Sequence, residues 1–123
     1  MNFPRKIPKP AKRSSRWKSQ AHLGHVRGHA CSNCGFMPAP PGKSEAAHVR
    51  LGSHTGMQQK PDDHRTVALC SACHSKQHTG EATFWREYEA RTGKSVDELI
   101  AFFVRTSPRR HEIELAKAGE QQQ

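Results

Sequence analysis

The sequence predicts a small α+β domain held together by a bound zinc ion, with a basic arm ahead of it and helices after it. Two observations support this fold class. The first is a pair of Cys-x-x-Cys motifs at 31–34 and 70–73, the spacing of a closed tetrahedral zinc site. The second is a thin core: only 33% of the 123 residues are hydrophobic. A domain so poor in apolar side chains usually needs a covalent or metal staple.

The cysteines by themselves allow either two disulfides or one zinc site. No hydrophobic signal segment opens the chain, and no apolar run is long enough to cross a membrane. We therefore expect a protein of the cytoplasm with no membrane association. A reducing compartment favours structural zinc over disulfides.

The positive charge is concentrated in the first third of the chain. The formal net charge is +9; residues 1–44 hold nine Lys or Arg and no acid, and the remainder holds eleven of each sign. A basic stretch beside a metal site predicts a polyanionic partner, and nucleic acid is the commonest one. The alternative is a solvated tail that only aids solubility.

The first half of the chain predicts an arm, a helix, a knuckle and two strands. Residues 1–17, rich in proline and basic residues, predict a disordered arm, with Trp17 either anchoring its end or stacking on a base. Ser19 is placed to cap a helix over 20–27 that ends at Gly28, with Leu23 and Val26 facing inward. A zinc knuckle over 31–35 follows, then strands over 45–51 and 66–69.

The second half predicts helices. One spans 71–78 and stops at 79–80, and the next spans 81–91 with its three aromatic residues buried. Ser95 has capping-box spacing ahead of an amphipathic stripe, and a last segment from Pro108 ends in a polar tail over 120–123. The predicted organisation is an arm over 1–17, a domain over 18–92 and a helical extension over 93–123. The stripe consists of Val96, Leu99, Ile100 and Phe103.

Histidines follow the second cysteine pair at once. His74 and His78 are four residues apart, so on a helix they share one face, as two ligands of one metal ion would. The chain therefore predicts a second metal site beside the cysteine site.

This combination of motifs resembles the HNH nucleases, the treble-clef branch of the ββα-metal fold. The resemblance covers roughly residues 20–90 and is closest to small phage and prophage proteins of this class, which implies a phage or prophage origin and the cytoplasm of a bacterial host. It is carried by the segments Cys31-x2-Cys34, Glu45-Ala46-Ala47-His48-Val49-Arg50, Thr55-Gly56-Met57, Lys60-Pro61-Asp62-Asp63, Thr66-Val67-Ala68-Leu69-Cys70-x2-Cys73-His74 and His78.

The resemblance implies a metal-dependent endonuclease that hydrolyses DNA phosphodiester bonds. His48 matches the general base, and His74 with His78 match the ligands of a catalytic divalent ion, Mg²⁺, Mn²⁺, Ni²⁺ or Zn²⁺. Such an enzyme leaves 5′-phosphate and 3′-hydroxyl ends. A structural Zn²⁺ would be held by Cys31, Cys34, Cys70 and Cys73.

Two positions depart from the family pattern. Ala47 stands where the family usually has a metal ligand, and Arg65 falls near the position of the central Asn. Either another residue completes the metal shell, or His48 is itself a ligand. The candidates for that further ligand are Glu45, His54, Asp62, Asp63 and His64.

Each candidate residue also has a purely structural interpretation. His48 could be satisfied by a backbone carbonyl, and His74 could pack on the knuckle or donate to a cysteine sulfur. Arg50 either contacts a phosphate or pairs with Glu45. Lys60 and Arg65 are predicted backbone-phosphate contacts, with solvated loop charges as the alternative. For His22, His25 and His29, a surface helix is favoured over a metal site.

The sequence thus predicts a monomeric HNH endonuclease with DNA as its partner. The first alternative is a non-catalytic, zinc-dependent DNA-binding protein of the same fold, and Ala47 is its best support. A zinc-organised protein adaptor is the third class, and it leaves the basic arm unexplained. Sequence specificity, DNA against RNA, and nicking against double-strand cutting stay open.

Overall fold

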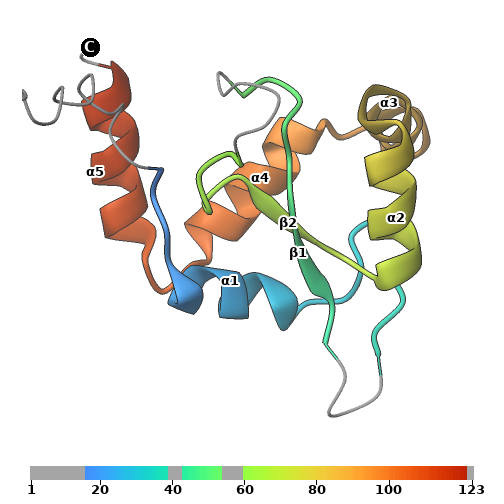
Figure 1. Cartoon of the computed structure of the whole chain (residues 1–123), viewed down its shortest axis with the longest axis horizontal. Helices are drawn as coiled ribbons and strands as arrows, with labels where there is room; N and C mark the ends of the chain where they lie inside the picture. Colours follow the sequence, from blue (N-terminus) through green and yellow to red (C-terminus); the bar gives the residue numbers. More distant parts are fainter. Residues whose placement is uncertain (1–15, 39–42, 54–59, 122–123) are drawn as a thin grey trace, which may run out of the picture.

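The computed structural model describes residues 16–38, 43–53 and 60–121. Within these residues the protein is a small α+β domain, with five helices around one two-stranded antiparallel sheet. In Figure 1 the hairpin lies between α1 and α5 on one side and α2 and α3 on the other, with α4 behind it. The order along the chain is α1 (Gln20–Arg27), β1 (Glu45–His48), β2 (Thr66–Leu69), α2 (Ser71–Thr79), α3 (Glu81–Thr92), α4 (Val96–Arg105) and α5 (Arg110–Gln121).

The hairpin is the centre of the core. Glu45 pairs with Leu69 and His48 with Thr66, and all four residues of β2 are buried. The first strand is shorter than the predicted 45–51. The Val49 amide still donates to the Arg65 carbonyl at 2.8 Å, but the chain then turns at Gly52, whose φ of 80° lies in the left-handed region that favours glycine. Pairing therefore ends where the backbone leaves the extended conformation.

Helix α1 follows its predicted capping. The Ser19 side chain accepts a hydrogen bond from the His22 amide, and Gly28 ends the helix. Leu23 and Val26 face the core, 7% and 0% exposed. The prediction that His22 lies on the surface of this helix is wrong: His22 is 0% exposed. The turn between α4 and α5 covers that side of α1, and Ser107 in it contacts the His22 ring.

The helices α2 and α3 pack beside the knuckles. Phe84, Trp85 and Tyr88 of α3 are buried in the core, as their spacing predicted. Gly93 ends α3 with φ 76°, a conformation that a side chain at this position would strain. The two helices are separated only by Gly80, so they run as an angled pair (Figure 1).

The helices after residue 93 pack into the same hydrophobic core as the hairpin. Ser95 caps α4, its hydroxyl accepting from the Glu98 amide at 3.2 Å, and Ile100 and Phe103 are buried in the cluster that contains the β-strands. Ile113 of α5 is 0% exposed in the same cluster. Helix α5 runs to Gln121, so the predicted polar tail over 120–123 begins inside a helix.

None of the helices in the described ranges is long and apolar enough to cross a membrane. The longest, α3 and α5, have 12 residues each, whereas a span needs about 20.

Candidate metal centre and histidine sites

The two knuckles bring the four cysteines into one cluster. Their sulfur atoms all lie within 4.8 Å of one another, and the Sγ atoms of Cys34 and Cys70 are 3.7 Å apart. A tetrahedral zinc ion with Zn–S bonds of about 2.3 Å has sulfur–sulfur edges of about 3.8 Å. All four cysteines are free, and this donor set and spacing fit a structural zinc ion. Among the described residues they form the one group of three or more metal-binding side chains.

Backbone and side-chain donors point at the sulfur atoms. The Cys34 amide lies 3.5 Å from Cys31 Sγ. Burial raises the pKa of the Cys31 thiol, but the surrounding backbone N–H groups outweigh it and bring the pKa down to about 7. Asn33 Nδ2 donates to Cys73 Sγ at 3.3 Å, and Arg91 of α3 holds Asn33 through its carbonyl oxygen at 2.9 Å. Such outer contacts orient metal ligands.

On α2, the two predicted metal-binding histidines meet at their Nε2 atoms. The Nε2 atoms of His74 and His78 are 3.2 Å apart. Glu45 at the start of β1 accepts a hydrogen bond from His74 Nδ1 at 2.6 Å, which leaves His74 Nε2 as the nitrogen with a lone pair. Two nitrogens bound to one ion at about 2.1 Å would be about 3.0 to 3.4 Å apart. The pair is therefore spaced as two neighbouring ligands, with Glu45 orienting one of them.

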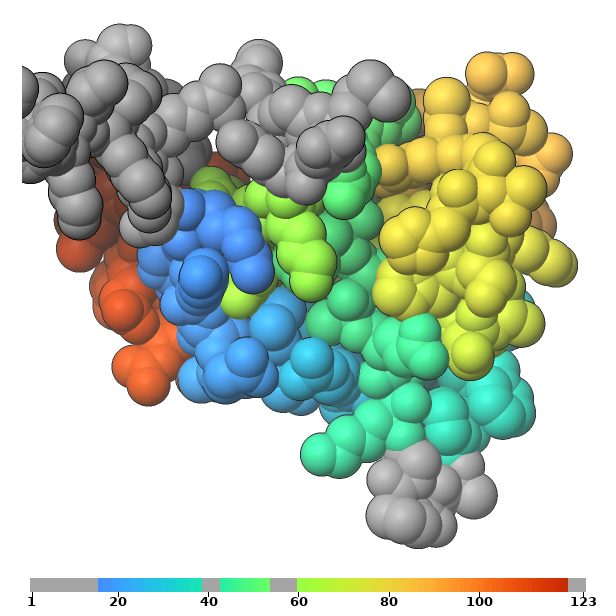
Figure 2. All heavy atoms as spheres, viewed as in Figure 1, coloured from blue at the N-terminus to red at the C-terminus, as the bar shows by residue number. Residues whose placement is uncertain are grey.

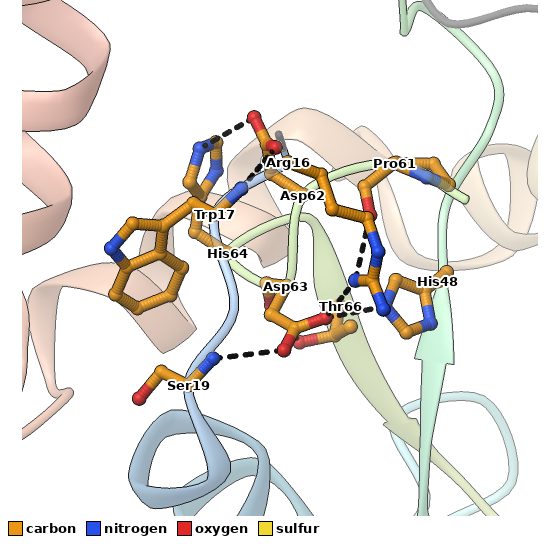
Figure 3. A network of polar contacts seen from close by, with 9 residues as sticks. All are labelled: Arg16, Trp17, Ser19, His48, Pro61, Asp62, Asp63, His64 and Thr66. Atoms are coloured by element: carbon orange, nitrogen blue, oxygen red, sulfur yellow. Dashed lines mark hydrogen bonds and ion pairs between the residues drawn. The ribbon is translucent and has the colours of Figure 1, made fainter. Parts of the chain in front are cut away.

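His48 lies in a different polar group. Its Nε2 is 3.0 Å from Asp63 Oδ1, and Arg16 approaches the same oxygen at 2.6 Å. The second carboxylate oxygen accepts from the Ser19 amide at 2.9 Å. Figure 3 shows these donors converging on Asp63 from the arm's end, from β1 and from the start of α1. A carboxylate that accepts three hydrogen bonds holds His48 in one orientation.

The charges in this group fix the proton on His48. Burial raises the pKa of Asp63, but the hydrogen bonds from His48, Ser19 and Arg16 outweigh it, so its pKa lies below the usual value. An ionised carboxylate can only accept, so His48 Nε2 carries the hydrogen. Burial lowers the pKa of His48, and Asp63 partly offsets that effect. At neutral pH the imidazole is uncharged, with its lone pair on Nδ1.

The segment 16–19 is tied to the loop before β2. The Trp17 amide donates to Asp62 Oδ1 at 2.7 Å, and the Asp63 amide donates to the Trp17 carbonyl at 2.9 Å. Figure 2 shows this segment, in blue, lying against the yellow-green loop. The Trp17 ring contacts the rings of His22 and His64, with centroids 6.0 and 5.8 Å away. Trp17 thus anchors the start of the described chain.

The two histidine groups lie on opposite faces of β1. Side chains alternate along a strand, so Glu45 and Ala47 share one face and His48 takes the other. Glu45 joins the α2 histidines, whereas His48 joins Asp63 and the 16–19 segment. No hydrogen bond or ion pair of the described residues joins the two groups. The structure therefore brings His74 to His78, and α2 meets His48 through Gln77, whose side-chain amide donates to the His48 carbonyl at 3.0 Å.

The residues predicted as candidates for a further metal ligand lie in two different places. Glu45 lies at the α2 histidines, whereas Asp62, Asp63 and His64 lie around Trp17. His54 falls outside the described ranges, as do Thr55-Gly56-Met57. Ala47 is 0% exposed in the core, so its position offers nothing to an ion.

The predicted phosphate contacts differ in how far they are engaged. Arg65 donates from Nε to the Val49 carbonyl at 3.2 Å and from Nη2 to the Leu51 carbonyl at 2.7 Å. These bonds shape the loop after β1. Arg50 and Lys60 are exposed, and the Arg50 amide donates to the Glu81 carboxylate at 3.0 Å.

The sequence did not single out the partnership of His48 with Asp63. A signal for it exists in the pairing of the strands: His48 faces Thr66, so a residue three positions before Thr66 lies near the end of β1. The role of Glu81 was also missed. Its carboxylate accepts from the Gln77 side chain at 3.0 Å and from Trp85 Nε1 at 3.2 Å, which needs the packed α2–α3 corner.

Two further histidines are buried beside the Trp17 ring. His22 Nδ1 is 2.7 Å from the Ser107 hydroxyl, while His22 Nε2 has no hydrogen-bond partner among the described residues. His64 Nε2 lies 3.4 Å from Asp62 Oδ2. Burial lowers the pKa of His22 to about 4 and also lowers the pKa of His64. Both imidazoles are therefore neutral at physiological pH.

Comparison of this chain with models of protein families, with curated proteins and with solved structures finds no match. A function for this chain is therefore inferred from its own residues.

Proposed function

We propose that this protein is a metal-dependent DNA endonuclease of the HNH class, with a treble-clef ββα-metal fold, as its motifs resemble. The observation that carries the proposal is the His48–Asp63 contact of 3.0 Å at the end of β1. A neutral imidazole held by a buried carboxylate is the arrangement of an oriented general base.

In the proposed reaction, His48 Nδ1 accepts a proton from a water molecule, and the water oxygen attacks a phosphodiester phosphorus. The 3′ oxygen leaves, so the products carry a 5′-phosphate and a 3′-hydroxyl. Asp63 is a positioning residue: it holds the His48 ring and stabilises the imidazolium that forms. Arg16, against the same carboxylate oxygen at 2.6 Å, places a positive charge beside the base, where a phosphate oxygen would benefit from it.

The proposed enzyme has two metal sites. The cysteine cluster would hold a structural zinc ion and keep both knuckles in register. His74 and His78, with Glu45 behind His74, would hold a divalent ion through nitrogens 3.2 Å apart. A divalent ion at such a site supplies charge to a phosphate oxygen and to the leaving group.

The nucleic-acid contacts of the proposal are Arg50, Lys60 and Arg65 together with the basic arm. Phosphate contacts of this kind give affinity without sequence specificity and weaken with salt. Lys60 and Arg50 are exposed near the end of the hairpin that carries His48, which supports a binding face there.

A non-catalytic DNA-binding protein of the same fold is the second candidate. It is favoured by a specific observation: His48 contacts Asp63 whereas Glu45 contacts His74, and Ala47, between Glu45 and His48 on β1, is fully buried. In this alternative the zinc cluster and basic arm organise binding, and the histidines only stabilise the hairpin.

Cleavage of supercoiled plasmid DNA tests the proposal. We expect nicking with Mg²⁺, Mn²⁺, Ni²⁺ or Zn²⁺ and none with excess chelator. His48→Ala should lower the rate by about 10²-fold or more, whereas His111→Ala, an exposed histidine on α5, should leave it unchanged. Cutting that survives His48→Ala would remove the proposed mechanism. Salt-sensitive DNA binding without cutting by the wild type would favour the second candidate.

A further inference from the structure

Helix α4 carries a second stripe of residues on the side away from the core. Its buried face is formed by Val96, Ile100, Phe103 and Val104. On the opposite side the exposed positions 98, 101, 102 and 105 recur at i, i+3, i+4 and i+7, which places them along one helix face. This outer stripe consists of Glu98, Ala101, Phe102 and Arg105.

Two grooves flank this stripe. One, between α3 and α4, has a volume of about 490 Å³ and is lined by Tyr88, Leu99 and Phe102. The other, between α4 and α5, has a volume of about 360 Å³ and is lined by Val104, Lys117 and Ala118. Ala101 and Arg105 line both grooves, so α4 forms a low ridge between them. Phe102 is 37% exposed despite its size.

We propose that the outer stripe of α4 is the interface of a symmetric dimer with a second copy of this chain. A two-fold axis that passes between residues 101 and 102 would lay two α4 helices side by side in antiparallel orientation. Each residue would then face a fixed partner position on the other copy. The surface is unassigned by the nuclease proposal and is independent of it.

The charges of the stripe are complementary under this symmetry. Glu98 and Arg105 lie about 5 Å on either side of the axis along the helix, from the rise of about 1.5 Å per residue. Glu98 of one copy therefore faces Arg105 of the other, and the reverse pair forms at the same time. Among the described residues neither side chain has an ion-pair partner; the Arg105 guanidinium lies 5.9 Å from the centroid of the Phe102 ring.

The sizes of the side chains that face each other across the axis are complementary as well. The same axis places the small Ala101 opposite the large Phe102 of the other copy. An alanine on the ridge lets the helices approach closely, and the aromatic ring fills the space beside it. A single helix face is at the low end of interface sizes, so we expect a dissociation constant on the order of 10 µM.

Sedimentation analysis of the full chain over a range of concentrations tests this dimer. The wild type should pass from monomer to dimer between about 1 and 200 µM. Glu98→Arg should weaken dimerisation by about tenfold or more, because two ion pairs become two repulsions. The double variant Glu98→Arg/Arg105→Glu should restore it.

Asp97→Arg is the matched control. It makes the same charge change in the first turn of the same helix, where an added positive charge is unfavourable, but it lies off the stripe. It should leave the dimer unchanged. A wild type that stays monomeric at 200 µM, or a Glu98→Arg variant that dimerises as well as the wild type, would overturn the proposal. Circular dichroism of each variant checks that the fold is retained.

Discussion

The two sides of the β1–β2 hairpin are stabilised by different chemistry. On the side of α2 and α3, four sulfur atoms within 4.8 Å of one another hold the knuckles, and their geometry suits a metal ion. On the side of α1, a single buried carboxylate, Asp63, joins the 16–19 segment, β1 and the loop before β2. The first side offers a site for an ion from outside the chain. The second depends only on hydrogen bonds between its own residues.

The comparison shows why the two sides should fail under different conditions. Thiolates release a metal when it is chelated or when they are protonated. A buried carboxylate network is insensitive to chelation. Removal of one member should lower the free energy of unfolding strongly, because the remaining donors are left without a partner. Substitutions on each side should therefore separate the dependence on a metal ion from the dependence on hydrogen bonds.

Cys70→Ser should have the largest effect. Cys70 is 8% exposed within the cluster, and zinc binding in such sites is coupled to folding. We expect the free energy of unfolding to fall by about 5 kcal/mol or more, which is close to the whole stability of a small domain. The variant should bind no zinc and show no cooperative thermal transition. Zinc analysis and a thermal melt measure this. Ser32→Ala, in the other knuckle, is the control, and an unchanged melt for Cys70→Ser would contradict a structural zinc ion.

Asp63→Ala should be the most damaging change on the other side. The variant leaves Arg16, His48 and the Ser19 amide without their shared acceptor. Breaking a buried ionic network costs about 3 to 4 kcal/mol, to be measured by urea unfolding at pH 7.5. Zinc content should not change, which distinguishes this variant from Cys70→Ser. Asp97→Ala, on the exposed side of α4, should cost far less, and equal losses for the two would argue against the network.

Acidification should weaken the α1 side through His22. The pKa of this imidazole is about 4 in the folded protein because of burial, against about 6.5 when unfolded. Between these values the unfolded chain binds more protons, so stability is present above pH 6.5 and is lost as the pH falls toward 4. The loss should be about 2 to 3 kcal/mol at pH 4.

Cysteine protonation also weakens metal binding over this range, so the test compares two proteins. Urea unfolding of the wild type and of His22→Leu at pH 7.5, 6 and 5 should give a shallower pH dependence for the variant. A parallel pH dependence would show that His22 contributes nothing to it.

Glu45→Gln should have the smallest effect and should act on the α2 histidines alone. Glu45 accepts from His74 at 2.6 Å, and loss of such an outer carboxylate lowers metal affinity by about tenfold. Calorimetric titration with Ni²⁺, after the structural zinc site is filled, measures this. Glu87→Gln, exposed on α3, is the control. Equal Ni²⁺ affinity in the wild type, Glu45→Gln and Glu87→Gln would show that Glu45 does not support metal binding.

Much of the fold could be predicted because its signals are local. Ser19, Ser95, Gly80 and Gly93 mark helix ends where the structure has them, since caps depend on a few neighbouring residues. The end of β1 was not predictable in this way. Val49 to Leu51 have strand-forming character, but Gly52 and the bonds from Arg65 to the Val49 and Leu51 carbonyls turn the chain.

The candidate sites divide in the same manner. The Cys-x-x-Cys spacing predicted a cysteine cluster, and the four-residue step from His74 to His78 predicted a histidine pair; the structure assembles both. The placement of His22 did not follow from its spacing, because its burial depends on Ser107, 85 positions away. Long-range packing of this kind leaves no periodic signal in the sequence.

Short spacings in the sequence predict the four-cysteine cluster, the ends of most helices and the pairing of the α2 histidines. The end of α5 at Gln121 is an exception. That His48 contacts Asp63 and Arg16, and that His74 contacts Glu45, follows from the packing of the domain. Along β1 the side chains alternate with a two-residue period, so neighbouring residues meet different elements, and the packing of the whole domain settles which elements lie on each face.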